Sequence, residues 1–548
     1  MVRETDKMVL FPGLQSTTMH QILNPLSLYL GLGLGLLMAT SHAADLPVAQ
    51  PRQVTDTYFG TTVTDPYRHF ENIKDPEVAA WMKAHSEFAH TQLKALPQRQ
   101  AFLNRLTQLD AAGGERVMRV QRLQDGRLFY LQREPSDNQY RLVTRSALNA
   151  SMQVLVDPDA LRKASGHSHA INWFRASPSG RYVAYGLSAG GSEDATLHVM
   201  DVATGKAVLK PLDRAEMGFQ DWHDDHSFTF TRLKLLAPGT PDAEKYRDPL
   251  TVKVNVQAGT VQELPVHAWT DLKLNHDMDV GVYRVGKQAL LRVGDGVANE
   301  VALYIGPWAQ IDKPKARWVK LAGFDAGITE FAVHGSTLYA LSHQNAPRYK
   351  IMALPMNGTR MAARVVVPPS DAVITDLASN AEALYYTARE GNAKRLWRLP
   401  YGAKQAIEVA LPSTGQIAFG GAGSTDVQAM QSSGLMISLS TWISPTQFFV
   451  LDAKGKAVPA GMPRPSQIEG LNDLEAKEVL VKSHDGLMVP MSIISKKGLK
   501  MDGRNPVWLT AYASYGLTME PGFSPARMAW LEKGGVLAVA HPRGSAVY

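Results

Sequence analysis

Residues 534–540 read Gly-Gly-Val-Leu-Ala-Val-Ala, an apolar run placed directly after two glycines. A second apolar run, Val-Trp-Leu, stands at 507–509, and a pair of strands is expected around His484-Asp485-Gly486. Short apolar runs bounded by turn residues are typical of buried strands. The residues from Val479 onward therefore predict the opening of a domain built around an α/β sheet.

This order of strands is similar to the start of an α/β-hydrolase domain. In that fold the nucleophilic serine lies on a sharp strand-to-helix turn that comes later, and the acid and the histidine follow it. The sequence ends at His541-Pro542-Arg543-Gly544-Ser545-Ala546-Val547-Tyr548. We therefore expect an incomplete hydrolase domain at 457–548, truncated before its nucleophile, acid and histidine.

The composition is that of a soluble globular protein with two or three domains. The chain has 548 residues, of which 45% are hydrophobic and 20% charged, and one core rarely grows that large. The net charge of +6 is not gathered into basic blocks, which argues against a nucleic-acid partner. Because there is no cysteine, disulfides, thiolate metal sites and a cysteine nucleophile are excluded.

Residues 1–43 are interpreted as a signal peptide. Arg3 and Lys7 precede an apolar run at 26–38, and Ser41-His42-Ala43 provides small residues for cleavage. A run of about 13 apolar residues is short for a permanent membrane anchor. We expect export to the periplasm or the medium, with no stable anchor after cleavage; an uncleaved anchor is the alternative.

Residues 44–115 predict a helical segment that packs on the hydrolase domain. Asp75 is a suitable helix cap, Pro76 suits the first turn and Glu77 complements the helix dipole. Apolar residues then recur at helical spacing, and a second helical stretch follows Pro97.

Residues 116–456 predict a seven-bladed β-propeller. Apolar-aromatic strands recur about every 45 to 60 residues, the length of a four-stranded blade. A β-sandwich array is the competing interpretation, which the even spacing makes less favourable. The seven recurrences are Leu128-Phe129-Tyr130, Tyr182-Val183-Ala184-Tyr185, Phe228-Thr229-Phe230, Leu290-Leu291, Leu338-Tyr339, Leu384-Tyr385-Tyr386 and Met436-Ile437.

Four motifs imitate catalytic or metal sites. Gly186-Leu187-Ser188-Ala189-Gly190 fits the nucleophile elbow, but another strand, not a helix, is expected after it. Ser483-His484-Asp485 holds all three triad residue types as neighbours in a turn, where they cannot converge. The pairs in His223-Asp224-Asp225-His226 and His167-Ser168-His169 lack an obvious third ligand, so we expect no metal.

Several segments resemble the prolyl oligopeptidase family of serine peptidases, in which a seven-bladed propeller covers an α/β-hydrolase domain. The resemblance covers the chain from about Pro51 onward. It implies a mainly β fold and a serine endopeptidase that cleaves short peptides after proline. We expect such peptides as partners, no cofactor and a monomer. The matching segments are Asp65-Pro66-Tyr67-Arg68, Ser177-Pro178-Ser179-Gly180-Arg181, Ser342-His343-Gln344-Asn345, Ser483-His484-Asp485-Gly486, Tyr512-Ala513-Ser514-Tyr515-Gly516 and Phe523-Ser524-Pro525.

The resemblance gives roles to two tyrosines. Tyr512 matches the tyrosine whose hydroxyl helps to hold the oxyanion, and Tyr515 matches an aromatic residue that lines the pocket for the substrate proline ring. From the residues alone, Tyr512 is an ordinary aromatic at the edge of a sheet. The chain departs from the family pattern at His69 and Asn72, at Ala513-Ser514, and at Ser545-Ala546.

The missing triad predicts that the chain as given has no hydrolytic activity, because no serine in it has a suitable base and acid. Two alternatives remain open. One is a non-catalytic exported propeller that binds peptides or a partner protein. The other is a sister oligopeptidase that prefers Lys or Arg before the cut.

Overall fold

The computed structural model describes residues 46–356, 363–420, 430, 432–514 and 516–544. The chain divides into two compact units, residues 1–99 and residues 100–548, which are described separately. The expected signal peptide lies outside the described residues. In the described part of the chain, none of the helices is both long and apolar enough to span a bilayer.

The first unit contains a β-hairpin and a long helix. Strands β1 (Val54–Tyr58) and β2 (Thr61–Asp65) pair antiparallel, and α1 spans Pro76–Ala95. The carboxylate of Asp75 accepts a hydrogen bond of 2.8 Å from the backbone N–H of Glu77, which satisfies one of the free donors at the start of α1. The helix start predicted from Asp75, Pro76 and Glu77 is confirmed.

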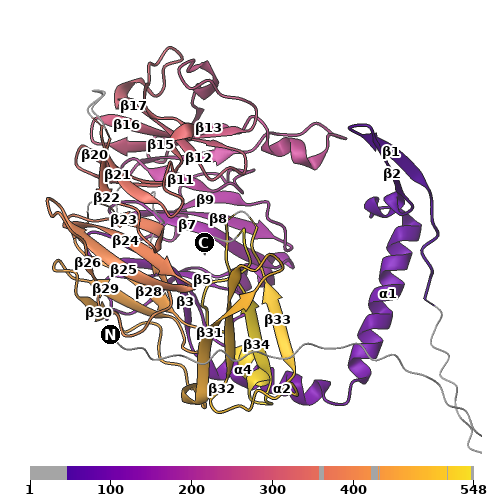
Figure 1. Cartoon of the computed structure of the whole chain (residues 1–548). Coiled ribbons are helices and arrows are strands. Elements are labelled where there is room, and N and C mark those ends of the chain that lie inside the picture. Colours follow the sequence, from indigo (N-terminus) through magenta and orange to yellow (C-terminus); the bar gives the residue numbers. More distant parts are fainter. Residues whose placement is uncertain (1–45, 357–362, 421–429, 431, 515, 545–548) are drawn as a thin grey trace, which may run out of the picture. The chain divides into compact units, whose positions relative to one another are not determined.

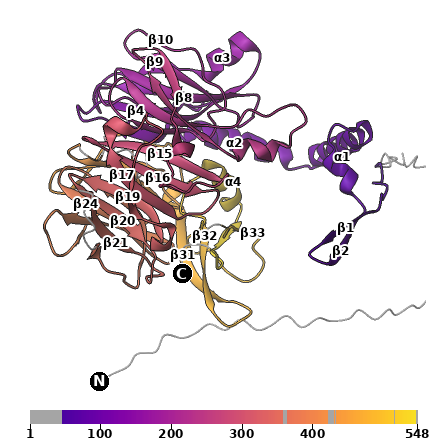
Figure 2. The same cartoon turned by 90° about the horizontal axis from the view of Figure 1, so that it is seen from above.

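The second unit contains seven consecutive four-stranded antiparallel sheets among its described residues. Figures 1 and 2 show them following one another in chain order from violet to orange. The prediction of a mainly β fold with a seven-bladed propeller is confirmed. The first four blades are β3 (Arg116–Arg122), β4 (Leu128–Arg133), β5 (Arg141–Arg145) and β6 (Gln153–Val156); β7 (His169–Ala176), β8 (Tyr182–Ala189), β9 (Thr196–Asp201) and β10 (Lys206–Ala207); β11 (Phe219–Trp222), β12 (Ser227–Arg232), β13 (Leu250–Asn255) and β14 (Thr260–Glu263); β15 (Met278–Val285), β16 (Gln288–Asp295), β17 (Val301–Pro307) and β18 (Val319–Ala322). The last three are β19 (Ile328–His334), β20 (Thr337–Ser342), β21 (Lys350–Pro355) and β22 (Arg364–Val367); β23 (Val373–Ser379), β24 (Ala383–Glu390), β25 (Ala393–Pro400) and β26 (Ile407–Glu408); β27 (Gln416–Phe419), β28 (Leu435–Ser440), β29 (Gln447–Leu451) and β30 (Ala457–Pro459). A short helix, α3 (Pro158–Ser165), joins the first two blades.

Each blade consists of four consecutive strands, so no strand is shared between the first blade and the seventh. Side-chain packing joins these two blades instead. Val117 and Tyr130 of the first blade share an apolar cluster with Met436 and Phe448 of the seventh. The guanidinium of Arg122 also donates a hydrogen bond of 3.1 Å to the carbonyl of Ser433. Burial of apolar area therefore holds these two blades together.

A mixed sheet follows the propeller, in the order β31-β32-β34-β33 (yellow in Figure 1). The hairpin β31–β32 has its turn at Ser483–Leu487, and β33 and β34 are parallel. The strands expected around His484, at 507–509 and at 535–540 are thus confirmed. The elements are β31 (Leu474–Lys482), β32 (Met488–Lys496), β33 (Val507–Ala511), α4 (Pro525–Leu531) and β34 (Val536–Ala540).

Helix α2 (Arg99–Ala112) packs on this sheet. Leu109 is fully buried there, in one cluster with Met528 of α4 and Val539 of β34. The guanidinium of Arg105 holds the carboxylate of Glu532 through two hydrogen bonds, of 2.9 and 2.5 Å. The start of the second unit is thereby tied to its end.

Candidate active site

The carboxyl ends of β33 and β34 lie side by side. Ala511, the last residue of β33, is paired in register with Ala540, the last residue of β34. Tyr512 and His541 come directly after these two residues. Ligands of α/β sheets bind outside the carboxyl ends of the parallel strands, so this edge is the candidate active site.

Tyr512 begins the stretch 512–522, whose described residues (512–514 and 516–522) have little regular structure and precede α4. Its side chain is 45% exposed. The oxyanion role that the resemblance implies for Tyr512 stays a prediction. Tyr515, the expected proline-pocket residue, lies outside the described residues.

His541 is the residue at this edge that the sequence analysis missed. Its ring is fully buried, with Nε2 2.9 Å from the hydroxyl of Ser492 on β32 and Nδ1 3.2 Å from the hydroxyl of Thr518. Burial, together with the positive charge of Arg389, lowers the pKa of His541 to about 4. His541 is therefore neutral at pH 7. The sequence held a signal for His541, because this residue directly follows the predicted strand at 535–540.

The contact between Ser492 and His541 does not make a nucleophile and a base. Both side chains are buried, and the second nitrogen of the imidazole faces the hydroxyl of Thr518 instead of a carboxylate. A catalytic histidine needs an acid that orients it and stabilises its charged form. The pair instead connects β32 to the 512–522 stretch.

The two sequence motifs that imitate catalytic sites are structural, as predicted. Ser188 is buried in β8, and the chain then turns into β9 instead of a helix. His484 is the second residue of the β31–β32 turn, where its Nδ1 lies 3.4 Å from the hydroxyl of Ser483. Asp485 accepts a backbone hydrogen bond of 3.2 Å from Leu487 within the same turn.

One of the histidines considered for a metal, His223, has protein partners for its Nε2 atom. Nε2 of His223 lies 3.2 Å from the hydroxyl of Thr229 and 3.3 Å from the carbonyl of Val282. Asp224 accepts hydrogen bonds from the backbone N–H groups of His226 and Ser227. Burial lowers the pKa of His223 to about 3. These contacts account for the motif as a turn and a buried link between two blades.

A cavity of about 350 Å³ lies between the 512–522 stretch and the fifth and sixth blades. Gly516, Leu517, Thr518 and Glu520 form one wall. The opposite wall includes charged residues of the propeller: Glu330 on β19, Asp376 on β23, Arg389 on β24 and Lys394 on β25. Its volume is that of a small-ligand site.

An ion network spans this cavity. One oxygen of Glu520 accepts a hydrogen bond from the guanidinium of Arg389 and forms an ion pair, at 2.9 Å, with the ammonium of Lys394. Lys394 also donates to Asp376 at 2.8 Å. Burial and the nearby charge of Asp376 raise the pKa of Glu330 to about 8, so this carboxyl is mostly protonated at pH 7.

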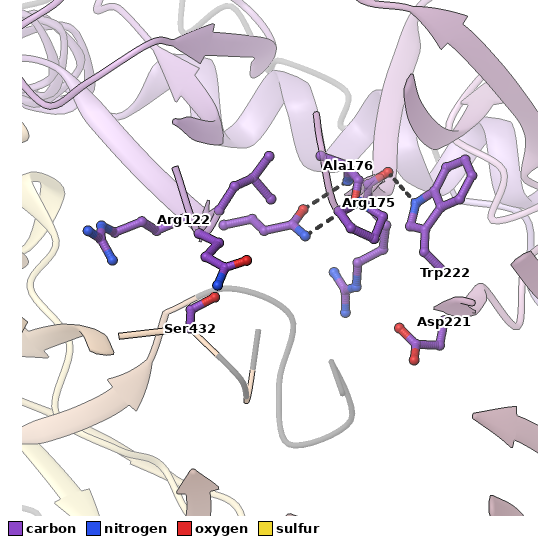
Figure 3. Close-up of a pocket in the computed structure, with 10 residues that line it drawn as sticks. Arg122, Arg175, Ala176, Asp221, Trp222 and Ser432 are labelled. Atoms are coloured by element: carbon purple, nitrogen blue, oxygen red, sulfur yellow. Dashed lines mark hydrogen bonds between the residues drawn. The ribbon is translucent and has the colours of Figure 1, made fainter. Parts of the chain in front are cut away.

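A second cavity, of about 50 Å³, is lined by residues of the first three blades and by Ser432 of the seventh, and Figure 3 shows its lining. The indole N–H of Trp222 donates 3.1 Å to the carbonyl of Arg175, and the side chain of Gln121 accepts from the backbone N–H of Ala176 at 2.9 Å. The space holds a few waters at most. We interpret these contacts as links between neighbouring blades.

The comparisons with known proteins agree with this arrangement. The family model described as the prolyl oligopeptidase N-terminal β-propeller domain matches residues 47–460. The chain belongs to the prolyl oligopeptidase family. This is a family of serine peptidases, and the resemblance predicted from the sequence is confirmed.

The relatives are similar over most of this chain. It is 24% identical over 517 residues to the prolyl endopeptidase of Elizabethkingia meningoseptica, which covers 93% of this chain and 70% of the relative. It is 23% identical over 525 residues to prolyl oligopeptidase A of Galerina marginata, covering 88% of this chain and 68% of the relative.

Solved structures show the same fold. A prolyl endopeptidase structure matches with a TM-score of 0.78 at 23% identity, covering 92% of this chain and 72% of that one. Prolyl oligopeptidase B of Galerina marginata, solved with a macrocyclization substrate, also has a TM-score of 0.78 at 19% identity and covers 92% of this chain and 73% of its own.

Proposed function

We propose that the chain supplies the propeller and the first catalytic-domain strands of an endopeptidase that cleaves short peptides after proline through an acyl-enzyme. The observation that supports this proposal is the parallel pair β33–β34: Tyr512 directly follows β33, and Gly516, Leu517, Thr518 and Glu520 of the same stretch line the cavity shared with the propeller. A hydroxyl placed here can donate to the oxygen on which negative charge develops during acyl transfer.

We also propose that the 548-residue chain binds such peptides but does not hydrolyse them. Two serines of the described residues have a hydroxyl within 3.5 Å of a histidine nitrogen, Ser492 and Ser483. In the described part of the chain, neither histidine has a hydrogen bond to a carboxylate. A serine without an oriented base is a weak nucleophile.

The test is an assay of the purified 548-residue chain with a blocked Gly-Pro chromogenic peptide, together with fluorescence anisotropy of a labelled proline peptide. We expect no turnover and measurable binding, weakened by the variant Tyr512→Ala. The matched control Tyr246→Ala alters a half-exposed tyrosine of the third-blade insertion. Turnover that a serine-directed reagent abolishes contradicts the inactivity; binding of a proline-free peptide with equal affinity contradicts the substrate class.

One observation favours the second candidate, a preference for Lys or Arg. The side chains of Asp376 and Glu520, which line the cavity, are about one-third exposed, whereas those of Arg389 and Lys394 are almost fully buried. A cavity that presents carboxylate oxygens suits a cationic side chain. Anisotropy with two peptides that differ only in Pro or Arg at one position decides between the candidates, since the tighter peptide identifies the preference.

We also propose export of the protein, on the basis of the apolar run at 26–38 and the small residues Ser41 and Ala43. Mass spectrometry of the secreted or periplasmic protein is expected to give an N-terminus at Ala44. An N-terminus upstream of the apolar run in that fraction contradicts cleavage.

A further inference from the structure

Three polar or charged residues at the turn between β24 and β25 are buried, although the turn joins two strands at the end of a blade. Arg389, Asn392 and Lys394 expose only 3–4% of their surface. Buried polar and charged groups need partners. Most partners of this turn, residues 389–394, lie outside the propeller, on the hydrolase strands and the 512–522 stretch. We refer to it as the sixth-blade turn.

Gly391 allows the sixth-blade turn to approach β31 closely. The residue has a φ of +59°, and a Cβ added to it would lie 2.1 Å from the carboxylate of Glu478. That carboxylate accepts a hydrogen bond of 2.8 Å from the backbone N–H of Asn392. A side chain at 391 would therefore meet both backbone strain and a steric clash. The contact with β31 is built around this glycine.

The same turn holds the stretch that follows Tyr512. The side-chain amide of Asn392 donates 3.4 Å to the carbonyl of Met519. The carboxylate of the next residue, Glu520, accepts a hydrogen bond from Arg389 and forms an ion pair with Lys394. Two consecutive residues of the stretch are thus bound by three side chains of one propeller turn.

The residue before them, Thr518, has a different partner. The hydroxyl of Thr518 lies 3.2 Å from Nδ1 of His541, and Nε2 of His541 lies 2.9 Å from the hydroxyl of Ser492. Three consecutive residues are therefore held in place: Thr518 by His541, which follows β34, and Met519 and Glu520 by the propeller. These anchors lie six to eight residues after Tyr512, within the same irregular stretch.

We propose that the sixth-blade turn and His541 position the 512–522 stretch, and that Glu520 is the positioning residue that couples the propeller to Tyr512. The role of Tyr512 in this coupling rests on the proposed function, whereas the anchoring of the stretch does not. Glu520 carries the coupling because it compensates two buried cations at once. Without its charge, Arg389 and Lys394 share Asp376 alone, and the stretch loses its charged link to the propeller.

Hydrogen exchange of the whole chain with Glu520→Gln tests the anchoring. In the structure the N–H of Gly516 bonds to the carbonyl of Gly544 and that of Leu517 to the carbonyl of Ser514. Loss of a charge-assisted hydrogen bond is expected to speed exchange of these amides by about tenfold or more. Amides of β4 in the first blade are expected to keep their wild-type rates.

The matched control is Glu532→Gln, which removes a different ion pair of the hydrolase segment, with Arg105. It is expected to leave Gly516 and Leu517 at wild-type rates. Should Glu520→Gln fold poorly, Asn392→Ala tests the same contact at Met519 without leaving a charge unpaired. Equal exchange at 516–517 in the Glu520 and Glu532 variants overturns the anchoring.

A spectroscopic readout tests the coupling to Tyr512. In protein labelled with fluorotyrosine, the Tyr512 signal is assigned by its loss in Tyr512→Phe. We expect Glu520→Gln to shift or broaden this ¹⁹F signal while Glu532→Gln leaves it in place. An unchanged signal in Glu520→Gln overturns the coupling. Neither measurement uses a peptide, so a failure of the proposed substrate is seen separately, in the anisotropy assay.

Discussion

His541 shows how a single buried side chain makes this fold sensitive to pH. The imidazole is fully buried between Ser492 and Thr518, and Arg389 adds a positive charge nearby. Both circumstances disfavour a second proton. An exposed histidine in the unfolded chain titrates near 6.5, whereas His541 in the folded chain titrates near 4.

Replacement of His541 by asparagine is expected to remove part of the acid sensitivity. Between pH 6.5 and about 4 the unfolded state binds the proton first, so the free energy of unfolding falls as the pH falls through this window. A shift of this size is worth about 3 kcal/mol when fully developed, and about 2 kcal/mol at pH 5. Urea unfolding at pH 7.5 and pH 5 measures the loss, which the His541→Asn variant should show to a smaller extent.

His484→Gln is the control for this prediction. His484 is exposed in the β31–β32 turn, so its removal should leave the difference between pH 7.5 and pH 5 as in the wild type. If His541→Asn and His484→Gln lose stability equally between these pH values, the buried histidine is not the cause.

At the residue scale, the sequence predicted only those residues that a local pattern or the family resemblance could identify. Asp75 was identified as a helix cap because capping depends on neighbours two positions away. Tyr512 was identified through the resemblance. The partnership of Arg389 with Glu520 joins residues 131 positions apart, and no local pattern reports such a distance. The cavity and its ion network were therefore missed.

At the scale of elements, the blade periodicity was visible because one strand of each blade is apolar on both faces. The seven recurrences found in the sequence all fall in the second strands: β4, β8, β12, β16, β20, β24 and β28. These strands lie inside their sheets and are largely buried. The first and fourth strands lie at the sheet edges and mix polar with apolar residues, so their signal is weaker.

Gly391→Ala is expected to weaken the sixth-blade turn more than backbone strain alone would. Gly391 and Gly402 both have positive φ and both lie in the sixth blade, but an added Cβ at 402 has no atom within 4 Å. Gly402→Ala should therefore cost about 1 kcal/mol of unfolding free energy. Gly391→Ala should cost about 2 to 4 kcal/mol, because it also displaces Glu478.

Thermal or urea unfolding of the two glycine variants measures this difference. Hydrogen exchange in β31 adds a local readout, since Glu478 belongs to that strand. Equal destabilisation by the two alanines, with unchanged exchange in β31, would show that the close approach at Gly391 contributes nothing.

At the scale of the whole molecule, the hydrolase sheet has an apolar edge. Val507, Trp508 and Leu509 are consecutive residues of β33, and each is 57–61% exposed. In a strand, neighbouring side chains point to opposite faces, so both faces of β33 are open to solvent. An exposed apolar edge strand is a site of self-association.

Trp508→Lys is expected to reduce association of the 548-residue chain. Dynamic light scattering and sedimentation at increasing concentration should show less high-mass material than in the wild type, because the added charge opposes edge-to-edge pairing. Val365→Lys is the control, since Val365 is a comparably exposed residue of β22 in the propeller. Equal association of both variants and the wild type contradicts the assignment to β33.

The contact of α2 with the final strands can form only late in translation. Arg105 and Glu532 are separated by 427 positions, and ribosomes add about 5 to 20 residues per second. The apolar side of α2 therefore emerges roughly twenty to eighty seconds before its docking surface exists. Seven blades can form in that interval, but α2, which precedes them in the chain, cannot dock until the final strands have been synthesised. A nascent chain of this protein thus presents Leu109 and its neighbours to chaperones throughout the translation of the propeller.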